Sequence, residues 1–193
     1  MPELPQHLVV AVSENGIKRP IELLLERRHY PAALVLTYSG VDTMAFLNMR
    51  AASSDVMRSD FIQWAEKYIR LSPEGAITGR DLYAARCSVL HGGAHSRLSR
   101  GGDCKLLRHI AAESDIPHNP AAPPGKEPDA QNSVTTVFIE DLVAAFFRGI
   151  DRFLRDVSDD NEKASLVETR LHYLVQTSPY MDGPRPIAPH ADG

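Results

Sequence analysis

Apolar residues recur along this chain at the three- and four-residue spacing of amphipathic helices. The pattern predicts helices over about residues 17–28, 31–47, 59–69, 79–90, 139–157 and 160–175. The segments 104–112 and 134–138 have the character of short strands. We therefore expect a mainly α protein, an up-and-down helical bundle of five to six helices with a small β-hairpin appendage.

Residues at the helix ends refine this picture. Ser59 is placed to cap the helix that follows it, and Thr78-Gly79-Arg80-Asp81 resembles a capping box with Asp in place of Glu. Gly40 lies in the middle of a predicted helix, where a glycine costs about 1 kcal/mol relative to alanine, so close helix packing is the expected reason. The helix over 79–90 has little polar face, so it should be buried. Four side chains are expected in the core: Trp64, Leu90, Phe146 and Ile150.

The chain divides into one domain and a tail. The helical bundle should occupy residues 1–178, with a hairpin or loop insertion at about 104–137. Residues 117–132 are rich in Pro, Ala and Asp, which is typical of a long exposed loop. Residues 179–193 contain four prolines, and we expect this tail to be disordered.

Composition narrows the class of protein. The 193-residue chain has a formal net charge of −4, so bulk basicity does not point to nucleic acid, and any basic patch must be local. Cys87 and Cys104 do not form a C-x-x-C pair, which favours free thiols in a reducing compartment. The sequence shows neither a signal peptide nor an apolar run long enough to span a membrane. We therefore expect a cytoplasmic protein without membrane association.

Two polar residues stand out on the helix over 79–90, namely Arg86 and His91. Five residues along a helix correspond to about 7.5 Å of rise and about 140° of rotation, so their side chains should flank one groove rather than share a stripe. An Arg–His pair without a metal suits cleavage of a phosphodiester beside a 2′-hydroxyl. The histidine moves the proton, and the guanidinium binds the phosphate. RNA has this hydroxyl and DNA does not.

A structural role is the alternative explanation of the same two residues, and spacing alone favours it. A buried arginine is often paired with a carboxylate, and Asp42 on the helix over 31–47 is a ready partner for Arg86. A histidine at a helix end is often only a cap. On this interpretation the chain is a non-catalytic module.

The segment Arg86-Cys87-Ser88-Val89-Leu90-His91 resembles the R-x-x-x-x-H motif of the HEPN superfamily (higher eukaryotes and prokaryotes nucleotide-binding). The resemblance covers about residues 17–95. It implies a helical bundle that is typically a homodimer. It further implies a metal-independent endoribonuclease with Arg86 and His91 as catalytic residues at the dimer interface. Such proteins often belong to toxin or defence systems, so RNA and an antitoxin-like protein are the implied partners. The supporting residues are expected to be Asp42, Tyr83 and Cys87.

Basic residues are concentrated just after this motif. Between residues 86 and 109 there are five Arg and Lys residues and one acidic residue, and His91, His95 and His109 add potential positive charge. An ordinary solvated loop is the alternative explanation. On the first interpretation, His95, Arg97 and Arg100 are candidates for binding RNA phosphates. His91 and His95 have a spacing that can hold zinc, but Gly92-Gly93 should break the helix, so we expect neither metal nor cofactor.

Overall fold

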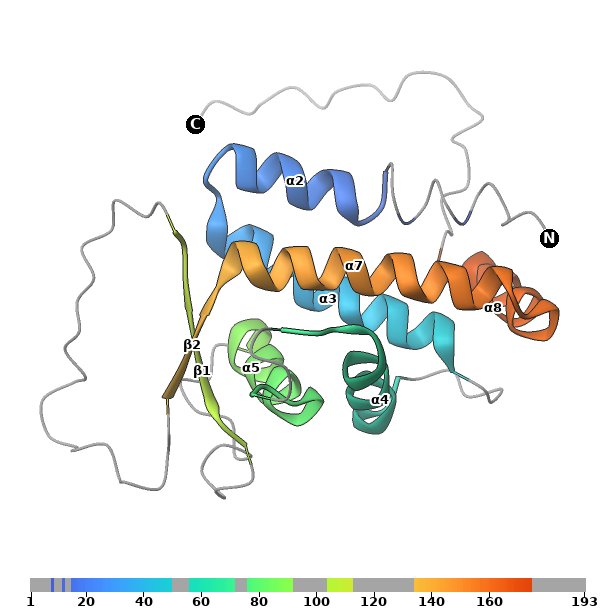
Figure 1. Cartoon of the computed structure of the whole chain (residues 1–193). Coiled ribbons are helices and arrows are strands. Elements are labelled where there is room, and N and C mark those ends of the chain that lie inside the picture. The colour runs from blue at the N-terminus through green and yellow to red at the C-terminus, as the bar shows by residue number, and fades with distance from the viewer. Residues whose placement is uncertain are drawn as a thin grey trace, which may run out of the picture.

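The computed structural model in Figure 1 is mainly helical, as the sequence predicts. It describes residues 8, 12, 15–49, 56–71, 76–91, 104–112 and 134–174, with the side chains of 172 and 173 excepted. None of the helices in these segments is both long and apolar enough to cross a bilayer. The elements are α2 (Lys18–Glu26), α3 (Tyr30–Asn48), α4 (Arg58–Tyr68), α5 (Gly79–His91), β1 (Leu106–Ile110), β2 (Val134–Phe138), α7 (Ile139–Ser158) and α8 (Asn161–Leu174).

Helix α3 is the centre of the fold and packs against α2, α4, α5, α7 and α8. Its own apolar residues are distributed around the whole helix, and nine of its residues are buried, as a central position requires. Figure 1 shows α7 and α2 running across the view, whereas α4 and α5 are seen much closer to end-on. The helices are therefore less uniformly aligned than in an up-and-down bundle, and α4 and α5 cross α7 steeply.

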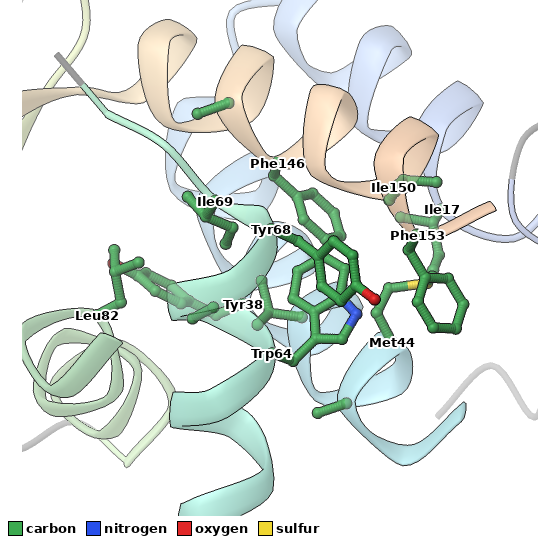
Figure 2. Packing of buried hydrophobic residues seen from close by; sticks show 14 of the residues in the cluster. Ile17, Tyr38, Met44, Trp64, Tyr68, Ile69, Leu82, Phe146, Ile150 and Phe153 are labelled. Atoms are coloured by element: carbon green, nitrogen blue, oxygen red, sulfur yellow. The ribbon is translucent and has the colours of Figure 1, made fainter. Parts of the chain in front are cut away.

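Aromatic rings from α4 and α7 fill the core. The ring of Trp64 lies 5.2 Å from that of Tyr68 and 5.9 Å from that of Phe146, measured between centroids. Figure 2 shows these side chains between the two helices. Trp64, Phe146 and Ile150 are fully buried, as expected. Gly40 allows this packing, because a Cβ atom there would lie 2.8 Å from Cζ of Phe146. The close helix contact predicted at Gly40 is thus confirmed.

The start of α5 is fixed by the predicted capping box. The backbone N–H and the hydroxyl of Thr78 both donate to Oδ2 of Asp81 at 2.8 Å, and the Asp81 N–H donates to Thr78 Oγ1 at 3.2 Å. Oδ1 of Asp81 accepts the backbone N–H of Lys105 at 2.6 Å, so the buried cap also ties α5 to the residue before β1. The cap predicted at Ser59 is wrong. Because α4 begins one residue earlier, Asp60 reaches back to the N–H of Met57 at 2.8 Å.

The two predicted strands are present, but they do not form a hairpin. They pair in parallel, from Leu106 opposite Val134 to Ile110 opposite Phe138. A tight hairpin turn joins only antiparallel strands, whereas a parallel pair needs a long connection, and residues 111–133 provide the required length. Strand β2 then leads directly into α7. The predicted loop over 117–132 and the tail over 179–193 lie outside the described residues.

Helix α5 is buried only in its first half, contrary to expectation. Gly79, Leu82 and Ala85 are buried, whereas residues 86–90 are half-buried and His91 is exposed. Leu90 is therefore not a core residue. The first half packs closely on α4, because a Cβ atom at Gly79 would lie 2.6 Å from the carbonyl oxygen of Ile62. The second half extends past this contact, which leaves the Arg86–His91 segment accessible.

Candidate functional site

The candidate site lies where the accessible half of α5 meets α3. Arg86 on α5 donates from Nε and Nη2 to Oδ2 of Asp42 on α3, at 2.9 and 2.8 Å. The two side chains are 21% and 25% exposed. The ion pair that a structural role for Arg86 requires is therefore formed, but it is open to solvent on one side.

The same guanidinium contacts His91. Nη1 of Arg86 lies 3.1 Å from Nε2 of His91. Helix geometry alone directs these two residues to different sides, and the long arginine side chain bridges the difference. A guanidinium can only donate, so Nε2 must be the acceptor and a neutral His91 must carry its proton on Nδ1. Arg86 thereby joins Asp42 and His91 in one hydrogen-bonded chain.

Arg86 keeps its positive charge in this environment. Burial lowers the pKa of its guanidinium, but the hydrogen bond and the negative charge of Asp42 outweigh that effect, and the net pKa is raised. The guanidinium has five N–H donors, and three of them bind Asp42 and His91. A ligand such as a phosphate oxygen can therefore bind only through the N–H groups that do not bind Asp42.

Tyr83 and Cys87, the other expected supporting residues, adjoin Arg86 on α5. Both are half-buried, and Cys87 is a free thiol. Burial raises the pKa of the Tyr83 hydroxyl, as do the charge and hydrogen bond of Cys87, while the positive charges of Arg86 and Arg58 act in the opposite direction. These residues therefore form one electrostatically connected group.

Arg58 is a member of this group that the sequence did not reveal. It is the first residue of α4 and is exposed, and its Cζ atom stands 5.5 Å from the centroid of the Tyr83 ring. The antiparallel packing of α4 on α5 brings the two together, with Phe61 against Tyr83 and Ile62 against Gly79. This contact depends wholly on tertiary packing, so no local sequence signal could have indicated it.

The structure describes only part of the basic patch that was predicted after the motif. His95, Arg97 and Arg100 lie outside the described residues. His109, counted as potential positive charge, is partly buried in β1, with Nε2 2.8 Å from the hydroxyl of Tyr38. Burial lowers the pKa of His109 to about 4, so it is uncharged at neutral pH and does not belong to the patch.

A concave site apart from Arg86 lies between α3, α4, α7 and α8, with a volume of about 1140 Å³. Asp156 there accepts hydrogen bonds from Lys67 at 2.7 Å and from the Tyr68 hydroxyl at 2.8 Å. The lining contains five carboxylates and only two lysines, so this groove repels anions. A phosphate ligand is therefore better matched to the region of Arg86 and Arg58.

Within the described segments, no group of three or more His, Cys, Asp or Glu side chains is placed to hold a metal ion. Comparisons of the chain with protein-family models, with curated proteins and with solved structures find no match. The chemistry of the Arg86–His91 site is therefore inferred from its own side chains.

Proposed function

We propose that the protein is a metal-independent endoribonuclease of HEPN type, with Arg86 and His91 as its catalytic residues. The observation that carries the proposal is the 3.1 Å contact between Nη1 of Arg86 and Nε2 of His91. It brings together, at one accessible place, a permanently charged guanidinium that can bind phosphate and an unprotonated imidazole nitrogen. These are the two groups that cleavage beside a 2′-hydroxyl requires.

Each group has one chemical role. On RNA binding the 2′-hydroxyl displaces Nη1 of Arg86 from Nε2 of His91, because the single lone pair of Nε2 accepts only one hydrogen bond. Nε2 then removes the proton from the 2′-hydroxyl, whose oxygen attacks the adjacent phosphorus as the bond to the 5′-oxygen breaks. The proton can then return to the leaving oxygen, which yields a cyclic phosphate and a free 5′-hydroxyl. The N–H groups of Arg86 that do not bind Asp42 bind the phosphate oxygens, whose negative charge grows in the transition state.

A homodimer is part of the proposal. Cys87, Val89 and Leu90 are half-buried in the single chain, which leaves apolar surface on α5 for a second copy. A twofold axis beside α5 would bring two copies of Arg86 and His91 together. A toxin or defence role in the cytoplasm, with an antitoxin-like protein partner, belongs to the same proposal and follows only from the family resemblance.

The alternative is a non-catalytic HEPN-like helical module for dimerisation or for binding a nucleotide or protein. One observation favours it: Asp42 engages both Nε and Nη2 of Arg86, so the charge of the arginine is already compensated. On this account the pair holds α5 to α3, and His91 has no chemical role.

Incubation of the protein with labelled single-stranded RNA in EDTA distinguishes the two. We expect cleavage of RNA, no cleavage of DNA of the same sequence, and loss of activity in Arg86→Ala. Arg86→Lys should restore little, because lysine keeps the charge but lacks the planar fork. Intact RNA after incubation with the native protein would favour the non-catalytic module.

A further inference from the structure

Arg86 by itself is a weak attractant for an anion. Its guanidinium shares two hydrogen bonds of 2.9 and 2.8 Å with one carboxylate oxygen of Asp42, so the pair is close to neutral when viewed from solvent. Arg86 can orient a phosphate that has already arrived. A separate, uncompensated cation is needed to draw the RNA backbone to the site.

Arg58 is such a cation. Within the described part of the chain it forms no ion pair, and its contact is with the Tyr83 ring, 5.5 Å from the centroid. The Arg58 side chain is also exposed, and a contact with a ring face leaves the N–H groups of a guanidinium free to bind phosphate in bidentate fashion. Its charge is therefore both held in place and available.

Tyr83 links Arg58 to the catalytic pair. The ring is held in an edge-to-face contact with Phe61, at 5.4 Å between centroids. Tyr83 and Arg86 are three residues apart on α5 and so share one side of the helix. Burial has the larger effect and raises the pKa of the Tyr83 hydroxyl, whereas the positive charges of Arg86 and Arg58 both lower it. Both guanidinium groups are therefore within electrostatic range of the same side chain.

We propose that Arg58, held over Tyr83, binds the phosphate next to the scissile one in a bound RNA strand. The Arg58–Tyr83 pair is then a backbone-binding subsite beside Arg86 and His91, and its role is binding rather than chemistry. This inference rests on the proposed RNA substrate, but it can be tested without cleavage.

Fluorescence anisotropy with a labelled 2′-O-methyl RNA oligonucleotide measures binding alone, because the blocked oxygen cannot attack. Arg58→Gln should weaken binding about tenfold, and it should reduce the slope of log affinity against log salt by about 0.7, as expected for one lost phosphate contact on a single strand. Arg58→Lys should retain the salt slope. The matched control is Arg80→Gln, at another exposed arginine, in the first turn of α5, which should change affinity by less than roughly twofold.

Two results would overturn the inference: Arg58→Gln and Arg80→Gln have the same effect, or the native protein does not bind the oligonucleotide. A parallel cleavage assay keeps this inference separate from the proposed function. Binding that depends on Arg58 without any cleavage supports the subsite and contradicts the ribonuclease. Cleavage that depends on His91, with Arg58→Gln equal to Arg80→Gln, supports the ribonuclease and contradicts the subsite.

Discussion

Arg86 donates two hydrogen bonds to a single carboxylate oxygen of Asp42, and a third N–H of the same guanidinium points to Nε2 of His91. One side chain thus takes part in holding α5 to α3 and in forming the candidate site. Loss of Arg86 must therefore affect stability as well as any activity. The two effects can be separated, because Asp42 belongs to the structural contact and His91 lies at the exposed end.

The first prediction concerns the strength of the Arg86–Asp42 pair. A double-mutant cycle with Arg86→Gln and Asp42→Asn, measured by urea unfolding, should give a coupling energy of about 1–2 kcal/mol. This lies between surface and buried pairs, because the side chains are 21% and 25% exposed. The control is the more exposed pair of Arg19 and Glu26, where about 0–0.5 kcal/mol is expected. Equal coupling in the two cycles would show that the Arg86–Asp42 contact stabilises the fold no more than an exposed ion pair does.

The second prediction compares two helix caps. Asp81→Ala should reduce the free energy of unfolding by about 2–4 kcal/mol, because it removes the cap of α5 and also leaves the N–H of Lys105 without its acceptor. Asp60→Ala removes only the bond to the N–H of Met57 and should cost about 1 kcal/mol. Chemical denaturation of both variants measures the difference. Similar losses would mean that the link from Asp81 to Lys105 is not stabilising.

The third prediction concerns acid stability. Burial holds the pKa of His109 at about 4, whereas an unfolded histidine titrates near 6.5. Between these values the unfolded chain binds a proton that the folded chain does not, so this contribution to stability is complete above pH 6.5 and is lost as the pH falls toward 4. The loss between pH 7.5 and pH 5 should be about 2 kcal/mol.

His109→Gln should remove most of this pH-dependent loss, since glutamine does not titrate. His29→Gln, at an exposed histidine before α3, should leave it unchanged. Urea unfolding at the two pH values measures both variants. Identical pH dependence in His109→Gln and the native protein would show that His109 does not cause the loss of stability at low pH.

Local patterns predicted most of the fold. Helical periodicity located, to within a few residues, the six helices of the described segments, because amphipathic spacing is a property of the segment itself. The Thr78–Asp81 capping box was predictable for the same reason. The direction of β2 relative to β1 was not predictable, because a five-residue strand has the same pattern of apolar and polar residues in a parallel and in an antiparallel pair.

The candidate site was predictable only in part. Arg86, His91 and Asp42 were singled out from residue type and spacing, and the structure brings all three together. Arg58 could not be found this way, since its contact with Tyr83 exists only once α4 packs against α5. The partial exposure of Leu90 was missed because a nearly apolar helix gives no sign of where its packing partner ends.

The central claim is that His91 moves a proton during RNA cleavage, and the rate of cleavage in His91→Ala tests it most directly. The matched control is His29→Ala, at an exposed histidine away from the site. Single-turnover cleavage of labelled RNA in EDTA should fall by about 10²–10⁴-fold in His91→Ala and should be unchanged in His29→Ala. Equal rates in the two variants, or no cleavage by the native protein, would contradict the account.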